Sequence, residues 1–201
     1  MNAANPLWKH IWRYLLLSVV LFAVSLVVGL RASPEVADTI FEDLKQSLAP
    51  LMETMGALGL VAFLLLIFLN NAIKALGAIA FGVLLGIPPI VFIGANGFMI
   101  GVAVLALQSS LGLGVIVASL VPHGIIEIPL LLLASALGMR VGMESLKYLL
   151  KQQSAVRAEL RRGLRIYVKW ILTGLCIAAL IEVFITPFFI LLIGGKELFI
   201  K

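Results

Sequence analysis

The stretch Pro122-His123-Gly124-Ile125-Ile126-Glu127-Ile128-Pro129 places a histidine and a carboxylate in one of the most apolar parts of the chain. From residue 54 to residue 139, the only formally charged residues are Lys74 and Glu127. A charge at the centre of a bilayer costs about 2.5 to 3.5 kcal/mol on insertion scales, so a membrane sequence keeps one where a partner, water or a function compensates. The sequence therefore predicts that Glu127 lies inside the protein with polar companions.

The composition of the chain is typical of a membrane protein. Of its 201 residues, 62% are hydrophobic and 12% are charged, and the mean hydropathy is +1.16. A soluble domain would carry about a quarter charged residues. We therefore predict an all-α integral membrane protein in which residues 1–201 form a single membrane domain surrounded by a lipid bilayer. No folded soluble domain remains to present a nucleic-acid site.

The charged residues are spread unevenly, and their distribution predicts the orientation in the cell membrane. The stretch 140–169 has eight basic and two acidic residues, a net of +6, whereas the stretch 31–53 has two basic and five acidic residues, a net of −3. Because Lys and Arg accumulate on cytoplasmic loops, we expect the first stretch, with a basic helix over 142–166, to be cytoplasmic and the second to face outward. Anionic lipid head groups would contact the arginines of this helix. These are Arg157, Arg161, Arg162 and Arg165.

The N-terminal segment 1–31 predicts a first transmembrane helix with a cytoplasmic N-terminus. Its aromatic and basic residues mark an interface and precede sixteen uncharged residues from Leu15 to Leu30. A cleavable signal peptide is the competing interpretation, which Leu30-Arg31-Ala32 disfavours because it lacks a small-x-small cleavage pattern. Segment 32–55 opens with an N-cap pattern, Ser33-Pro34-Glu35, and predicts an amphipathic helix on the outer face.

Four of the remaining apolar runs are too short to cross a bilayer, which takes about 20 residues. They form two pairs, each interrupted by polar or helix-breaking residues. The pairs are 56–69 with 75–86 around Asn70-Asn71, and 111–121 with 130–141 around Pro122-His123-Gly124. One long run follows each pair, 90–107 after the first and 170–193 after the second. Two short pieces around a polar tip are typical of a re-entrant hairpin, whose irregular backbone must be buried in protein or line a wet cavity.

Because this order occurs twice, it predicts two repeat units, residues 56–107 and residues 108–193, followed by an outer tail over 194–201. Two re-entrant hairpins give three full crossings, whereas seven result if every piece spans. Either threading leaves the two units inverted across the bilayer, as in many transporters. We favour the hairpins, because the run 111–121 at about 1.5 Å per residue covers only about half of the hydrocarbon thickness.

The residues around His123 predict an irregular turn that enters a half-helix. Pro122 offers no N–H for a helical hydrogen bond, Gly124 permits a positive φ, and Pro129 suits the first turn of a helix. Glu127 would then lie at the N-terminal end of the half-helix, where the helix dipole favours a carboxylate. His123 is within reach to share a proton with it. A buried pair that only fixes the hairpin is the structural alternative.

Glu182 is expected near the middle of the last span, twelve residues from Trp170 and eleven from Ile193, so it too needs a partner. Pro187 leaves the carbonyl of Val183 without a donor and predicts a kink one turn away. We predict that Asn71, His123, Glu127 and Glu182 approach one another in the interior. The full set of predicted buried polar residues for an ion or a solute is Asn70, Asn71, Lys74, Asn96, His123, Glu127 and Glu182. Lys74 has the alternative of extending to an interface.

The sequence gives no basis for predicting an enzyme, a cofactor or a bound metal. One histidine and one glutamate four residues apart do not complete a zinc site, and His10 belongs to the far interface. The chain has no Ser-His-Asp order, no glycine-rich phosphate loop after a strand, and no second carboxylate next to Glu127 in the sequence.

Several of these elements together resemble the stage II sporulation protein M family. The motif 122–129 is preceded by Asn70-Asn71 and Asn96-Gly97 and followed by the stretch Ile181 to Pro187. The proline-histidine-glycine-x-x-glutamate core is the most specific part of the resemblance, which covers roughly residues 60–187. The chain departs from the family pattern after Pro129, where Leu130 is bulkier than the expected alanine.

The resemblance implies a small multi-span protein of bacterial or archaeal membranes. Sporulation members of the family are associated with a peptidoglycan-degrading complex, in which the membrane subunit serves as a scaffold. The resemblance does not decide between two expected functions. The buried polar residues predict transport of a proton, an ion or a small solute, and the alternative is a scaffold that docks an extracytoplasmic protein partner by residues 33–53 or 194–201. We also expect a homo-oligomer, because one bundle of this size has little room to bury several polar groups.

Overall fold

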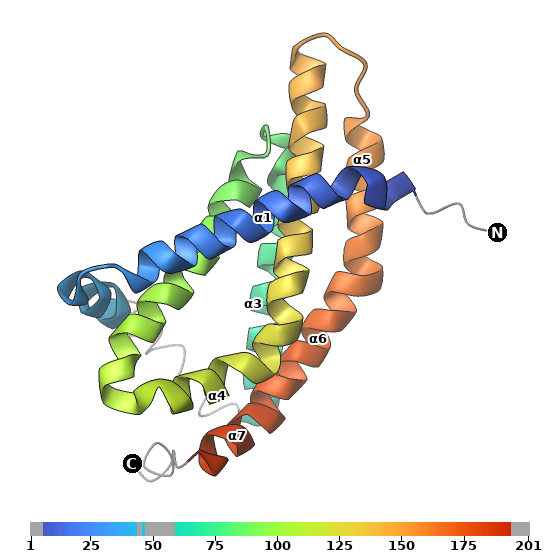
Figure 1. Cartoon of the computed structure of the whole chain (residues 1–201). Coiled ribbons are helices and arrows are strands. Elements are labelled where there is room, and N and C mark those ends of the chain that lie inside the picture. The colour runs from blue at the N-terminus through green and yellow to red at the C-terminus, as the bar shows by residue number, and fades with distance from the viewer. Residues whose placement is uncertain (1–5, 44–45, 47–58, 194–201) are drawn as a thin grey trace.

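The computed structural model describes residues 6–43, 46 and 59–193, and every regular element among them is a helix (Figure 1). In chain order these are α1 (Pro6–Leu30), α3 (Leu60–Ala80), the 3-10 turn η1 (Phe81–Val83), α4 (Ile87–Leu149), α5 (Val156–Ile166), the π-helix η2 (Tyr167–Ile171), α6 (Leu172–Leu180), the π-helix η3 (Ile181–Ile185) and α7 (Thr186–Leu192). In hydrocarbon, every backbone N–H and C=O needs an internal partner, and a helix provides it. The predicted all-α class is confirmed.

Within the described residues, five helical stretches are long and apolar enough to cross a membrane. They are Ile11–Leu30, Leu60–Val83, Ile87–Gln108, Leu111–Leu149 and Val156–Leu192. The spans present large apolar side chains outward, for example Val61 at 70% and Phe184 at 58% exposure. Such a surface is suited to lipid and not to water. The multi-span class is therefore confirmed, and the described residues offer five candidate spans where the sequence predicted seven or three.

The first predicted hairpin is wrong, because α3 runs without interruption through Asn70 and Asn71. An asparagine lowers helix propensity by less than about 1 kcal/mol, whereas a break inside a bilayer leaves backbone groups unpaired at a cost of several kcal/mol each. The Asn70 side-chain amide donates to the Asn71 side-chain carbonyl at 3.4 Å, and the helix continues past both. Leu60–Val83 is consequently one span of 24 residues.

The irregular turn predicted at Pro122–Gly124 is also wrong. The backbone of α4 is helical across Pro122 and Pro129, Gly124 has no positive φ, and the one non-helical residue is Gly112, with φ 75° and ψ 151°. Only glycine adopts such a conformation readily, because it has no Cβ. A proline removes one hydrogen bond and bends a helix that otherwise continues. Figure 1 shows that the yellow-green part of α4 runs across the base of the molecule and then bends upward.

The predicted basic helix 142–166 is two helices. α4 ends at Leu149, the chain turns with a positive φ of 56° at Lys151, and α5 begins at Val156. Both flanking helices continue into spans, and two consecutive antiparallel spans require a turn between them. The basic residues are therefore gathered around one turn, at the end of the molecule that we call the basic end.

The inverted relation predicted for residues 56–107 and 108–193 stays a prediction, and the candidate spans do not favour it. Each unit contains two spans among its described residues, whereas inversion requires an odd number of crossings. Two units with two crossings each begin on the same side of a membrane. In Figure 1, α3 of the first unit and the upward-running part of α4 in the second unit rise in the same direction.

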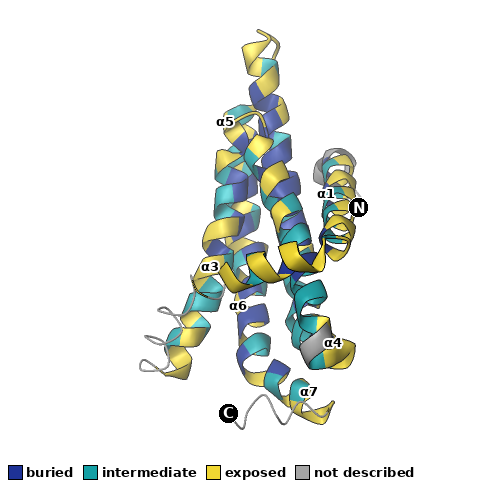
Figure 2. Cartoon of the chain, turned by 90° about the vertical axis from the view of Figure 1, so that its left-hand side faces the viewer, coloured by how far each residue is buried: buried dark blue, intermediate teal, exposed yellow. Residues whose placement is uncertain are grey.

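Glycines let the helix backbones pack closely at two contacts. Gly97 and Gly101 of α4 lie directly against the backbone of α1, and Gly138 of α4 lies against the carbonyl of Ala78 on α3. Small residues at helix interfaces allow such close approach. The apolar core is built from Ala75, Ile79, Ile93, Leu131, Leu137, Ile171 and Leu175. Figure 2 shows the buried residues concentrated along α3, α4 and α6, while α1 lies to one side.

Outside the spans, residues 34–43 form a helix, and the Ser33 hydroxyl accepts a hydrogen bond from the Val36 N–H at 3.3 Å. This is the N-cap that the sequence predicts. Apart from residue 46, the rest of the predicted outer helix 32–55 lies outside the described residues, as does the predicted tail 194–201.

Candidate functional site

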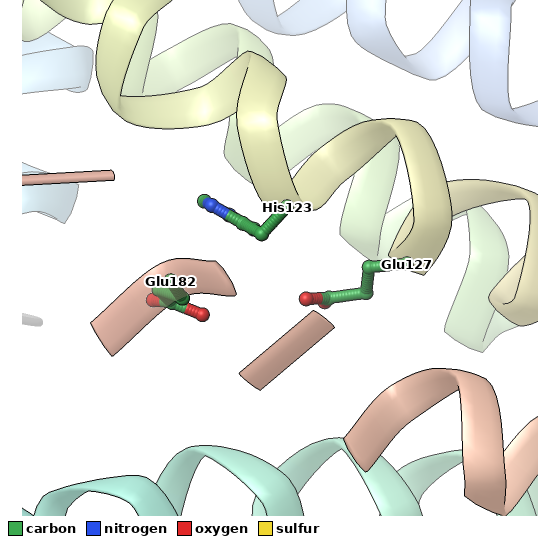
Figure 3. Close-up of side chains that lie close together, drawn as sticks. All are labelled: His123, Glu127 and Glu182. Carbon is green, nitrogen blue, oxygen red and sulfur yellow. The ribbon is translucent and has the colours of Figure 1, made fainter. Parts of the chain in front are cut away.

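His123, Glu127 and Glu182 form a cluster within the spans, which we call the triad. One ligand atom from each side chain, an imidazole nitrogen or a carboxylate oxygen, lies within 4.8 Å of the other two, and all three residues are half-buried. In Figure 3, the side chains of His123 and Glu127 leave α4 toward the last helix, where Glu182 lies. The structure brings together three of the four residues predicted to approach one another, and the approach of the fourth, Asn71, stays a prediction.

His123 and Glu127 share one face of α4 because they are four residues apart on a continuous helix, and not because a turn brings them together. The prolines that flank them still shape this face. Since Pro129 has no N–H, the carbonyl of Ile125, one turn earlier, lacks its helical donor. The turn of α4 between His123 and Glu127 therefore contains a backbone oxygen that is free to accept a hydrogen bond.

Glu182 is supplied by the π-helix η3, directly before the proline-containing helix α7. A π-helix inserts one extra residue into an α-helix and often marks a functional site. The Thr186 hydroxyl donates to the carbonyl of Ile181 at 3.3 Å, which occupies one acceptor of this widened turn. The kink predicted from Pro187 thus corresponds to a change from π to α geometry at Ile185 and Thr186.

No ion pair or hydrogen bond neutralises the carboxylates of the triad within the part of the chain that the structure describes. Glu127 and Glu182 have neither a salt bridge nor a hydrogen bond there, and Nδ1 of His123 is buried without a hydrogen-bond partner. Lys74 is close enough to act electrostatically on Glu127, but its own side chain is exposed. Glu127 and Glu182 also act on each other as like charges. Two carboxylates are thus held together without a matched cation.

The other predicted polar residues have different neighbours. Asn71 accepts its side-chain hydrogen bond from the exposed Asn70, and the Asn96 amide donates to the carbonyl of Phe92 on its own helix at 2.8 Å. These bonds are local to α3 and α4. The participation of Asn70, Asn71 and Asn96 in a solute site stays a prediction.

A second group of charged residues, which the sequence did not single out, lies near the basic end. The Arg140 guanidinium donates to both carboxylate oxygens of Glu159, at 2.6 and 2.9 Å, and Arg162 adds a bond of 3.1 Å. Glu144 accepts from Lys147 at 2.6 Å and from the N–H of Ala155 at 2.9 Å. We call these residues the ion-pair cluster. Its signal in the sequence was that the stretch 140–169 contains only two acids, and both are in the cluster.

The four arginines predicted to contact lipid head groups lie on α5. Arg157, Arg161 and Arg165 are exposed, whereas Arg162 is partly covered and bonded to Glu159. Beside them is an apolar cavity of about 600 Å³, whose lining includes Leu84, Leu149, Leu160 and Arg157. Arg157, Arg161 and Arg165 therefore remain available at the basic end of the bundle, whereas Arg162 is engaged by Glu159.

The comparisons with known proteins give one finding. A family model described as Stage II sporulation protein M matches residues 18–187, a range that includes the triad and the ion-pair cluster. This confirms the resemblance carried by the motif 122–129. No curated protein and no solved structure matches the chain.

Proposed function

We propose that this chain, which belongs to the stage II sporulation protein M family, is a transport-type protein of the cell membrane that moves a proton, an ion or a small solute by way of the triad. The observation that carries the proposal is the triad itself: two carboxylates and an imidazole converge inside apolar spans, and no described residue forms an ion pair with either carboxylate. Ionisable residues within spans are costly, and they usually mark substrate or ion pathways.

Flux in proteoliposomes tests this proposal. Glu127→Gln keeps the size of the side chain and removes its charge, so proton or cation flux should fall about tenfold or more, the loss expected for one charged contact. Glu35→Gln is the matched control, because Glu35 is exposed and outside the spans. Equal flux through wild type and Glu127→Gln would reject transport through the triad.

The proposed orientation places the N-terminus and the basic end in the cytoplasm. Successive spans alternate in direction, so the turn before α5 lies on the opposite side from residues 31–59, and the positive-inside rule assigns the basic side to the cytoplasm. In a Cys176→Ser background, an impermeant maleimide applied to intact cells should label Ala32→Cys and spare Gln153→Cys. The reverse labelling pattern would invert the topology.

A membrane scaffold is the second candidate. The capped helix 34–43 lies outside the spans and exposes Val36 at 48%, which suits contact with a membrane surface or an extracytoplasmic partner such as a peptidoglycan-remodelling complex. A scaffold predicts that Glu127→Gln leaves flux at background and partner capture unchanged, while variants at Val36 lose capture.

The same proposal includes two kinds of contact with the surroundings. Exposed arginines of α5 would bind anionic lipid head groups, each contributing about 1 kcal/mol at the membrane surface. Copies of the chain would form a homo-oligomer through the exposed small and apolar faces of the spans. Native mass spectrometry from anionic nanodiscs would report both the copy number and retained lipid.

A further inference from the structure

We propose that the triad is a binding site for a divalent first-row metal ion of the zinc class, with His123, Glu127 and Glu182 as three protein ligands and one coordination position left open. This inference deepens the proposed function by naming the class of ion. The sequence alone offered only one histidine and one glutamate, and the fold adds Glu182 from a segment 55 residues further along the chain.

The donor set points to this class of ion. Zinc and its neighbours accept imidazole nitrogen and carboxylate oxygen together, whereas magnesium and calcium prefer oxygen alone and copper(I) prefers sulfur. Three protein ligands with an open fourth position are typical of zinc sites that exchange a ligand, whereas structural zinc sites are closed with four. All three residues are half-buried, so the described structure does not fully enclose the triad.

The spacing of the ligand atoms suits a common central ion better than direct bonds between the side chains. The three atoms lie within 4.8 Å of one another, yet no hydrogen bond joins any two of these residues in the described structure. Two ligands about 2.0 to 2.2 Å from a tetrahedral zinc are roughly 3.3 Å apart. In the proposed site, rotations of the three side chains close the remaining distance.

Charge gives a separate argument. Two carboxylates bring a formal charge of −2 into a cluster for which the described residues supply no ion pair, and a divalent cation would neutralise both at once. The imidazole contributes an unpaired nitrogen at the same place. A dication with one neutral and two anionic ligands thus satisfies all three side chains.

Metal binding by the full chain, purified in detergent without an affinity tag, tests the proposal. After chelator treatment and dialysis against Zn²⁺, we expect about one Zn²⁺ per chain by mass spectrometry and a tetrahedral absorption spectrum with Co²⁺. Glu182→Gln should weaken Zn²⁺ binding about tenfold or more in calorimetry. Glu182→His, which restores a zinc ligand, should recover most of the affinity, whereas Glu35→Gln should bind like wild type. Each variant is first checked for an unchanged helical circular dichroism spectrum.

The outcomes separate this inference from the proposed function. Failure of the wild type to retain Zn²⁺, or equal affinity in Glu182→Gln, would overturn the metal site. Proton flux that depends on Glu127 and persists in chelator, with no bound Zn²⁺, would overturn the metal site and leave the proposed transport intact. Stoichiometric Zn²⁺ that requires Glu182, in a protein without any flux, would support the metal site and overturn transport.

Discussion

The triad and the ion-pair cluster use the same kinds of side chain under opposite conditions. In the ion-pair cluster, Glu159 is bonded by Arg140 through two oxygens and again by Arg162, so its charge is matched. In the triad, Glu127 and Glu182 lie near each other without a matched cation in the described residues. Acids that are paired within the protein stabilise the fold, whereas unpaired ones are available to a ligand.

Position in the bundle explains why the two clusters differ. Arg140 and Glu159 lie near the basic end on consecutive antiparallel helices, and a short turn brings them together. The triad joins the middle of α4 to the last helix across the apolar interior. A buried ion pair is strongly destabilised when one partner is removed, because the other charge is left without compensation. The same removal in the triad would relieve a repulsion.

The largest expected effect on stability is that of Glu159→Gln. This change leaves the side chain of Arg140, which is only 17% exposed, without its bidentate partner, and should lower the free energy of unfolding by about 3 kcal/mol. Unfolding in mixed micelles, followed by circular dichroism, measures the loss. Ordinary surface substitutions such as Glu35→Gln change stability by less than about 0.5 kcal/mol. A loss in that range would contradict the claim that the ion-pair cluster stabilises the fold.

A smaller loss is expected from Gly138→Ala, which tests the helix contact beside the ion-pair cluster. A Cβ at Gly138 would meet the carbonyl oxygen of Ala78 and the side chain of Pro89, so α3 and α4 must separate. We expect this separation to lower the free energy of unfolding by about 1 to 3 kcal/mol. Gly77→Ala is the control, because its Cβ would meet only the Phe81 side chain at 3.7 Å. Equal stabilities of the two variants in the same unfolding assay would show that α3 and α4 do not pack as closely as described.

The smallest effect on stability is expected from Glu182→Gln. Removing one of two neighbouring carboxylates relieves their repulsion, so the free energy of unfolding should stay within about 0.5 kcal/mol of wild type or rise. The same unfolding assay measures this free energy in the presence of a chelator, so that bound metal does not contribute to the stability. A loss as large as that of Glu159→Gln would show that the triad, like the ion-pair cluster, stabilises the fold.

The sequence predicted the helical membrane class and the approach of Glu182 to His123 and Glu127, because both follow from the cost of charge in hydrocarbon. The prediction failed at two places where residues that disfavour a helix lie inside a membrane span. Asn70-Asn71 and Pro122 do not break their helices, since unpaired backbone groups at that depth cost more than the local preference. The helix is interrupted at Gly112 instead. In the sequence, the only indication of this break is a glycine within an apolar run.

The ion-pair cluster could have been inferred from the sequence only in part. Glu144 and Glu159 are the two acids of a basic stretch, which makes pairing with some of its eight basic residues a reasonable expectation. The choice of Arg140 as partner depends on the turn between Leu149 and Val156. That turn was missed because the apolar and basic periodicity continues on both sides of it.

The π-helices in the last span have a mechanical consequence. Each contains one more residue than an α-helix of the same rise, and a π turn moves along a helix when neighbouring backbone bonds exchange acceptors. Every residue that such a turn passes rotates by about 100° around the helix axis, while both helix ends stay in place. Moving η3 by one turn would therefore swing Glu182 away from His123 and Glu127 without displacing any loop.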